Sequence, residues 1–320
     1  YLGEFLMDPY VISVPWILRR LIVSCFILPF RPKSTAEAYE TIWMKEGSPL
    51  LFYTKKLCQQ LEVKHKLNIE IAMRYGKPGI SEALESFNKR GIDNLYVLPL
   101  YPQFCDATVT TSINEAIKKN DQNANLHIVP PFYSSEEFVN SSKTIIAEHL
   151  PTNFDHLLFS YHSLPERQIK KSDSTGALCL AKENCCSTDV GTNTLCYRRQ
   201  CLKTSELIAE GLKLNSSKYS SSFQSKLGPI PWLSPSTEEI LSDLARTGVK
   251  RLVVACPSFV ADNLETLEEI GTRGKETFIN AGGKDLTLIP CLNDHPEWVA
   301  SLSRLLINHS SKDAKAVTSV

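Results

Sequence analysis

Short strand-like runs, most of them apolar, alternate along the chain with longer stretches that have helical periodicity. Apolar runs of this length are typical of buried strands, and the longer stretches are typical of amphipathic helices. Strands are predicted at residues 69–73, 94–100, 127–130, 156–161, 220–224, 251–255 and 286–289. Helices are predicted at residues 50–61, 80–90, 109–119, 135–149, 203–214, 236–246, 263–280 and 297–308. The alternation indicates an α/β fold in which helices cover both faces of parallel sheets.

A polar break at residues 150–155 divides this pattern into two parts. The chain has 320 residues, a length that suits one large or two medium domains. We therefore predict two similar α/β halves. No G-x-G-x-x-G or Walker-type loop follows a predicted strand, so the chain carries no nucleotide-binding fingerprint.

Charge and composition are those of an ordinary globular protein. Lys plus Arg and Asp plus Glu each number 35, and hydrophobic residues make up 42% of the chain. Because no excess of positive charge is present, nucleic acid is not expected as a partner. Acidic Glu4 and Asp8 precede the most apolar stretch, which argues against a secretory signal and for a cytoplasmic protein.

The most apolar stretch, residues 11–30, contains proline, arginine and serine and is too interrupted to span a bilayer. Its apolar positions follow helical spacing, with Arg19 and Arg20 beside them. The pattern predicts an amphipathic helix with a basic edge. This helix either packs its apolar side chains on the core or forms an apolar lip that contacts a hydrophobic ligand or the membrane surface.

His162 follows the apolar residues of the predicted strand at 156–161. In open α/β sheets, ligands bind in the crevice outside the carboxyl ends of the strands. A neutral imidazole at that position can accept a proton or bind a metal. The alternative is a histidine that only hydrogen-bonds a loop carbonyl.

A second apolar strand, at residues 251–255, is followed by a turn and an acidic helix. Asp262, Glu265 and Glu269 stand three and four positions apart, so they share one face of a helix. One interpretation is a capping box made by Asp262 and Glu265. If both strands belong to one sheet, Glu265 faces His162, and such a pair can remove protons and bind a divalent cation.

Several longer segments occur in an order that resembles the ferrochelatase family, enzymes that insert ferrous iron into a porphyrin. They are residues 28–33, 46–49, 73–76, 100–103, 155–167, 223–233 and 262–270. The resemblance covers nearly the whole chain and implies two doubly wound, Rossmann-like domains with a porphyrin cleft between them. We expect one domain at residues 1–130, on which a C-terminal helix at 295–310 packs, and a second at 131–294.

The resemblance also implies roles for individual residues. His162 would accept the pyrrole protons, Glu265 would assist in handling protons or Fe²⁺, and Asp262 joins them as a candidate catalytic residue. Arg31 and Ser48 match positions that hold the porphyrin propionates, although Arg31 could instead be a plain surface charge. The pocket would be lined by Arg74, Tyr75, Tyr101 and Trp232.

The chain departs from the family pattern at several points. The opening strand of the first domain is missing before Tyr1, Arg273 stands where some relatives carry an acidic residue, and Asn263 stands where some carry histidine. The family's lip suggests peripheral contact of residues 11–30 with the inner membrane. Protoporphyrin IX is the expected substrate; alternatives are a related tetrapyrrole such as coproporphyrin, a cobalt substrate, or a non-catalytic haem- or cluster-binding sensor. Oligomeric state is left open.

Half of the ten cysteines gather in an otherwise polar insert at residues 171–201. Thiolates at such spacing bind a soft metal or a cluster. Disulfides are disfavoured in a cytosolic enzyme, and a zinc site is the remaining alternative. Some ferrochelatases carry a [2Fe–2S] cluster, and we expect one here. Four ligands would come from Cys179, Cys185, Cys186, Cys196 and Cys201.

Overall fold

A computed structural model describes residues 2–121, 123–182, 184–187, 194–226 and 228–317. The chain divides into two compact units. The first unit comprises Tyr1–Pro99, Cys105–Pro130 and Leu305–Val320, and the second comprises Leu100–Phe104 and Pro131–Arg304. Helix α13 (Pro296–Val317) therefore contributes residues to both units.

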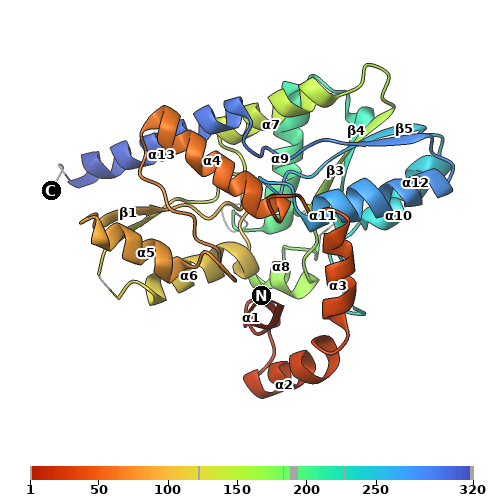
Figure 1. The fold of residues 1–320 in the computed structure, drawn as a ribbon. Helices are drawn as coiled ribbons and strands as arrows, with labels where there is room; N and C mark the ends of the chain where they lie inside the picture. Colours follow the sequence, from red (N-terminus) through yellow and green to blue (C-terminus); the bar gives the residue numbers. More distant parts are fainter. Residues whose placement is uncertain (1, 122, 183, 188–193, 227, 318–320) are drawn as a thin grey trace. The chain divides into compact units, whose positions relative to one another are not determined.

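The second unit is built on a four-stranded parallel sheet with the order β4-β3-β5-β6 (Figure 1). Its strands are β3 (His156–His162), β4 (Tyr219–Gln224), β5 (Arg251–Ala255) and β6 (Asp285–Leu288). In the ladder, Leu158 lies opposite Ser220 on one side and Val254 on the other. Because β3 lies between two strands, its carboxyl end is flanked by the ends of β4 and β5.

Successive side chains of β3 point to opposite faces of the sheet. Leu158 packs on one face with Leu241 and Phe278, which belong to α10 (Thr237–Arg246) and α12 (Lys275–Asn280). Tyr161 points to the other face, where its hydroxyl lies 2.8 Å from that of Ser205 in α9 (Tyr197–Gly211). Helices thus cover both faces, which explains why the run from Leu157 to Tyr161 is continuously buried.

Further helical segments of the second unit precede β3 or connect its strands. They are α7 (Glu136–His149), α8 (Glu166–Lys171), the 3₁₀ turn η4 (Ser216–Lys218), α11 (Leu264–Thr266) and the π-helical η5 (Leu267–Gly274). Segments α11, η5 and α12 follow one another directly, so the predicted helix at 263–280 forms with a wide π turn in its middle.

The first unit has a two-stranded parallel sheet of β1 (Asn94–Val97) and β2 (Asn125–Ile128). Its α-helices are α1 (Leu2–Leu6), α2 (Trp16–Leu21), α3 (Arg31–Glu40), α4 (Pro49–His65), α5 (Ile80–Lys89) and α6 (Thr111–Lys118). Two segments are π-helical: η1 (Ile22–Ile27) directly follows α2, and η2 (Asp106–Thr110) directly precedes α6.

The predicted α/β class with parallel sheets is confirmed, and six of the seven predicted strands form. The strand predicted at residues 69–73 does not form, so that prediction is wrong. An apolar run becomes a strand only where another backbone pairs with it. Here Met73 makes only an isolated bridge with Gly79, and its N–H donates to the Pro78 carbonyl at 2.7 Å.

Candidate functional site

His162 is the last residue of β3, where it pairs with Gln224 of β4. Its N–H donates to Ser258 Oγ at 3.2 Å, and its carbonyl accepts from the Tyr197 hydroxyl at 2.8 Å. Because both main-chain polar groups are bonded to side chains, the backbone at this position is held from two sides.

The imidazole of His162 has a defined tautomer. Nδ1 lies 2.7 Å from the carbonyl of Ser163, and the Ser163 N–H donates to the Gln224 carbonyl at 2.8 Å. A carbonyl can only accept, so Nδ1 carries a proton, and the lone pair of the neutral imidazole is on Nε2. The hydrogen bond to a loop carbonyl, which was the alternative interpretation of this histidine, is therefore present, and it orients the ring without using Nε2.

Glu265 lies in the first turn of α11, at the carboxyl end of β5. The turn is capped by Asn263, whose Oδ1 accepts from the Thr266 N–H at 3.1 Å while Thr266 Oγ1 accepts from the Asn263 N–H at 3.1 Å. The capping box is thus one residue beyond the predicted Asp262–Glu265 pair, and that interpretation is wrong. Since a side-chain amide makes the cap, the carboxylate of Glu265 takes no part in it.

The structure brings His162 and Glu265 close enough to interact electrostatically. Burial raises the pKa of Glu265, the nearby His162 opposes this, and the like charge of Glu269 adds to it. The Glu265 carbonyl accepts from Gln224 Nε2 at 2.7 Å, which fixes the turn against the neighbour of His162 in the sheet. His162 and Glu265 therefore lie at the carboxyl ends of neighbouring strands, β3 and β5, of one sheet.

Glu269 lies in the π-helical η5 and is tied to the loop after β4. Its two carboxylate oxygens accept from the N–H of Ser225 at 2.7 Å and from the Ser225 hydroxyl at 2.6 Å. π turns are rare and often occur at functional sites. Arg273, at the position where an acidic residue was expected in some relatives, pairs with Glu268 at 2.7 Å.

Asp262 is buried and bonded throughout to protein groups. It accepts from the Cys291 N–H at 3.1 Å, from Asn293 Nδ2 at 2.7 Å and from Thr266 Oγ1 at 3.2 Å. These contacts join the loop after β5 to the loop after β6. The structure places Asp262 next to Glu265 in the chain but gives its carboxylate a bracing position.

Sequence reasoning missed the polar side chains that organise this edge. Gln224 Oε1 accepts from Ser160 Oγ at 2.7 Å, and Ser160 Oγ also lies 2.8 Å from Thr237 Oγ1. Ser160 and Gln224 are buried polar residues near the carboxyl ends of β3 and β4. In the sequence, a polar residue that interrupts an apolar run is the signal by which Ser160 could have been found, whereas the mostly polar β4 offers no such signal for Gln224.

The loop after β4 also positions Trp232. It forms an isolated bridge with Pro165, and the neighbouring Leu233 N–H donates to the Leu164 carbonyl at 2.9 Å. The indole is half-buried beside the segment that follows His162. Tyr101 is half-buried in the second unit, two residues before Gln103, whose amide donates to Thr204 Oγ1 at 3.2 Å.

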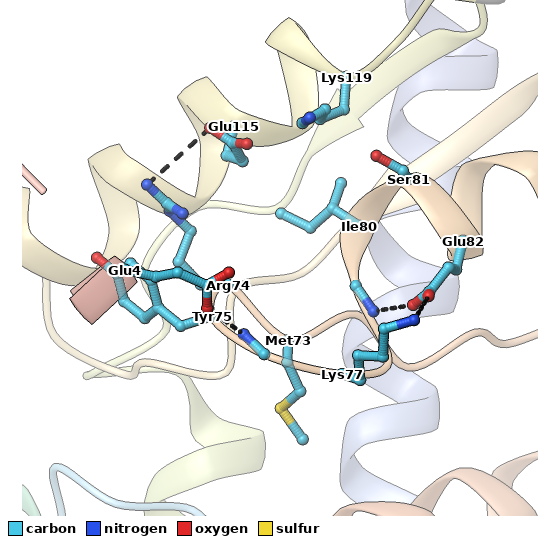
Figure 2. Close-up of a pocket in the computed structure, with 12 residues that line it drawn as sticks. Glu4, Met73, Arg74, Tyr75, Lys77, Ile80, Ser81, Glu82, Glu115 and Lys119 are labelled. Carbon is cyan, nitrogen blue, oxygen red and sulfur yellow. Dashed lines mark hydrogen bonds and ion pairs between the residues drawn. The ribbon is translucent and has the colours of Figure 1, made fainter. Parts of the chain in front are cut away.

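In the first unit, Arg31 is the exposed first residue of α3, and Ser48 is the N-cap of α4. Ser48 Oγ accepts from the Leu51 N–H at 3.3 Å. Arg74 and Tyr75 lie side by side, with the guanidinium carbon 4.4 Å from the centroid of the tyrosine ring. Figure 2 shows them at the edge of a cavity of about 360 Å³ that Glu4, Lys77, Glu82, Glu115 and Lys119 also line.

Four cysteines of the insert are linked by contacts between pairs of sulfurs. Cys185 and Cys186 have sulfurs 3.9 Å apart, Arg198 Nη1 donates to Cys186 Sγ at 3.1 Å, and Cys196 shares hydrogen bonds with both Cys179 and Cys186. Hydrogen bonding to Cys196 and burial raise the pKa of Cys186. Cys201 is buried further along α9, close to Tyr161.

No disulfide joins any of the ten cysteines in the described structure. Within the described parts of the chain, no three His, Cys, Asp or Glu side chains are arranged closely enough to hold a metal ion.

The stretch at residues 11–30 presents apolar side chains to solvent instead of facing the core. Ile17 is 75% exposed and Phe26 66% exposed, while Arg19 is buried with its Nη1 donating to the Ile12 carbonyl. The other exposed apolar side chains of this stretch are Trp16, Leu18, Leu21 and Phe30. In the described ranges, every helix is too short or too polar to cross a membrane.

Solved chelatases share this fold. SirB from Bacillus subtilis with Fe³⁺ aligns with 84% of this chain and 94% of its own, at a TM-score of 0.57 and 13% identity. SirB from Bacillus subtilis subspecies spizizenii in complex with cobalt aligns with 83% of this chain and 92% of its own, at a TM-score of 0.52 and 12% identity. At this level of identity the likeness shows the fold alone.

Sequence relatives are much closer. Ferrochelatases of Ectopseudomonas mendocina and Stutzerimonas stutzeri are 46% and 48% identical to this chain, and each match spans 95% of the chain and 91% of the relative. The ferrochelatase of Azotobacter vinelandii is 46% identical over the same shares. The family model for ferrochelatase matches residues 1–310. The chain therefore belongs to the ferrochelatase family, the enzymes that make haem by inserting iron into a porphyrin.

Proposed function

We propose that His162 accepts the pyrrole protons while Fe²⁺ enters protoporphyrin IX, and that Glu265 assists. The observation that carries this proposal is the tautomer of His162. Its Nδ1–H is taken up by the Ser163 carbonyl, which leaves the Nε2 lone pair for a substrate proton.

Metal insertion replaces two N–H protons of the macrocycle with one dication, so two protons must leave. Nε2 of His162 takes a proton directly. Glu265 has a raised pKa because it is buried, so its carboxylate binds a proton more readily than an exposed glutamate does. The pair can therefore receive protons in turn, and the carboxylate charge stabilises the imidazolium that forms. Asp262 supports Glu265 by bracing its turn.

We also propose the remaining porphyrin contacts. Arg31 has an exposed guanidinium that suits a propionate. Ser48 Oγ already accepts one hydrogen bond, so its hydroxyl proton is left to donate to a second propionate. Arg74, Tyr75, Tyr101 and Trp232 offer flat or aromatic surfaces on which a macrocycle packs.

The test of the base is His162→Ala. Metal insertion, followed as fluorescence loss when Fe²⁺ or Zn²⁺ enters protoporphyrin IX, should fall by at least ~100-fold, the usual contribution of a general base. Porphyrin affinity should stay within about twofold of wild type because the base is not a binding contact. His149→Ala, at an exposed helix end in the same unit, is the matched control. Near-wild-type insertion by His162→Ala would remove the assignment.

The same assay separates the alternatives. Faster insertion into coproporphyrin than into protoporphyrin, or of Co²⁺ than of Fe²⁺, would favour a related chelatase. Binding of haem without insertion of any metal would favour a sensor.

We propose that Cys179, Cys185, Cys186 and Cys196 hold a [2Fe–2S] cluster. Support comes from the sulfur contacts within this group and from Arg198, whose positive charge stabilises thiolate. Cys201 lies apart, beside Tyr161, and is left out of the set. Such a cluster supplies one-electron chemistry and a structural crosslink when bound.

Anaerobic purification tests the cluster proposal. Iron and sulfide in equal amounts, with a visible charge-transfer spectrum that Cys196→Ser abolishes, are the expected results. Cys25→Ser, at an exposed position outside the insert, should keep that spectrum. A colourless protein loaded with zinc would replace the cluster by a zinc site.

We further propose that the exposed apolar side chains of residues 16–30 touch the surface of a membrane. Apolar side chains with basic Arg20 among them are typical of helices that lie in the interface of a bilayer.

A further inference from the structure

The carboxylate of Asp8 is buried behind Arg74 and Tyr75 in the first unit, with only 4% of the residue exposed. One oxygen, Oδ2, accepts from Arg74 Nη2 at 2.5 Å, from the Tyr75 hydroxyl at 2.9 Å and from Thr111 Oγ1 at 2.5 Å. The other, Oδ1, accepts from the Tyr10 N–H at 2.8 Å. Both oxygens of the carboxylate thus accept hydrogen bonds from groups of the protein.

Thr111 closes a ring of hydrogen bonds. Arg74 Nε donates to Thr111 Oγ1 at 2.9 Å, and Thr111 Oγ1 in turn donates to Asp8. Two sides of the Arg74 guanidinium are therefore fixed, and its flat face rests on the ring of Tyr75. Burial and the Asp8 hydrogen bond raise the pKa of Tyr75, so its hydroxyl stays a neutral donor.

The positive charge of Arg74 is compensated on both its inner and its outer side. Asp8 pairs with it inside, and Glu115 Oε2 lies 4.0 Å from the same Nη2. Figure 2 shows Glu115 and Glu4 beside Arg74 at the cavity wall. A guanidinium that already neutralises one carboxylate gains little from another, because the new partner meets acidic neighbours. Arg31, by contrast, is exposed.

We propose that Asp8 is a positioning residue that sets substrate specificity. It holds Arg74 and Tyr75 as a flat, electrically compensated surface and prevents Arg74 from binding a porphyrin carboxylate. This inference rests on the proposed contact of Arg74 and Tyr75 with the porphyrin. The surface of Arg74 and Tyr75 would then contact an edge of the macrocycle that carries no carboxylate. A porphyrin with two propionates has such an edge, so it is preferred over a porphyrin with four.

The test is Asp8→Asn, which keeps the size of the side chain and removes its charge. The dissociation constants of protoporphyrin IX and coproporphyrin III are measured by fluorescence titration in wild type and variant. With Arg74 uncompensated, the affinity ratio should shift toward the four-carboxylate porphyrin by about tenfold, the effect of one hydrogen bond to a charged group.

Thr111→Val is the matched control. It breaks the same ring of hydrogen bonds and leaves both charges in place, so thermal stability should fall while the affinity ratio stays within about twofold. If Asp8→Asn lowers stability in the same way and leaves the ratio unchanged, Asp8 only braces the fold and the proposal is overturned.

A second variant covers the case in which Asp8→Asn does not fold. Asp8→Asn combined with Arg74→Gln removes both charges together, and its affinity ratio should equal that of wild type. A tenfold shift of this double variant toward protoporphyrin would mean that Arg74 binds a carboxylate in wild type, which also overturns the proposal. Zinc insertion is measured in parallel. If a protein binds both porphyrins but inserts no zinc, the result speaks against the proposed insertion chemistry. The ratio of the two porphyrin affinities, in contrast, tests only the role of Asp8.

Discussion

The buried carboxylate of Glu265 lowers the stability of the folded protein when it is ionised, although its proposed role requires it to accept a proton. Its pKa is raised above the ordinary 4.5, so the folded state binds a proton more tightly than the unfolded state. Between the ordinary pKa and the raised one, the folded protein holds more protons than the unfolded chain. The free energy of unfolding therefore falls as pH rises through this window, and it is constant above it.

Glu265→Gln keeps the shape of the side chain and removes this titration. We expect the variant to gain thermal stability over wild type at pH 8, with a smaller gain or none at pH 4.5, and to lose most of its metal insertion. Thermal unfolding of both proteins at the two pH values is the measurement. An equal difference at both pH values would mean that Glu265 ionises freely in the folded protein. Glu276→Gln, elsewhere on the same helical segment, is a suitable control.

At this scale, sequence reasoning singled out residues near the carboxyl ends of apolar strands and missed those that act through long-range contacts. His162 could be singled out because it ends the buried strand β3, and Glu265 because it lies in the first helical turn after β5 of the same sheet. Asp8 was not, because its partners Arg74 and Thr111 are 66 and 103 residues away. The cap at Asn263 was misplaced by one residue, since Asp and Asn both accept N-cap hydrogen bonds and spacing cannot choose between them.

Among the elements, α2 and η1 show most clearly how burial changes an interpretation of sequence. The apolar positions of residues 11–30 suited a helix packed on the core as well as an apolar lip. Which face of the helix is buried depends on Arg19, which is 6% exposed and donates to the carbonyls of Ile12 and Val14. Because the arginine faces inward, Leu18 and Leu21 beside it face solvent.

The exposed side of α2 and η1 should bind membranes. Wild type should cosediment with vesicles of phosphatidylcholine and phosphatidylglycerol. Ile17→Glu combined with Phe26→Glu should weaken this binding by at least about tenfold, since each change removes an exposed apolar side chain that the bilayer would bury. Val63→Glu, an exposed apolar position on α4, should bind as wild type does. Equal sedimentation of all three proteins would contradict the proposal.

Helix type was beyond sequence reasoning, although helix position was not. The predicted helix at 263–280 forms, but η5 widens it to a π turn, and apolar spacing does not separate a period of 3.6 residues from a local insertion. The strand predicted at 69–73 failed for a related reason. Periodicity shows that a run could be a strand, whereas pairing depends on a neighbouring backbone.

For the whole molecule, the formal net charge of zero has a consequence for substrate binding. A porphyrin with two propionates is a dianion, and a neutral protein exerts little long-range attraction on it. Any dependence of its affinity on salt must then come from local contacts, within roughly the 10 Å over which charges act at 0.1 M salt. Arg31 is the exposed cation proposed for that contact.

Arg31→Ala should therefore weaken protoporphyrin binding by about tenfold at low salt, the effect of one charged hydrogen bond. It should also remove most of the decrease in affinity that wild type shows between 0.05 and about 0.5 M salt, because screening acts on the contact that the variant lacks. Lys33→Ala, an exposed cation two positions along α3, tests whether the effect is specific to Arg31 or follows from net charge. If both variants lose affinity and salt dependence equally, the dianion responds to the overall field of the helix, and Arg31 is a surface charge.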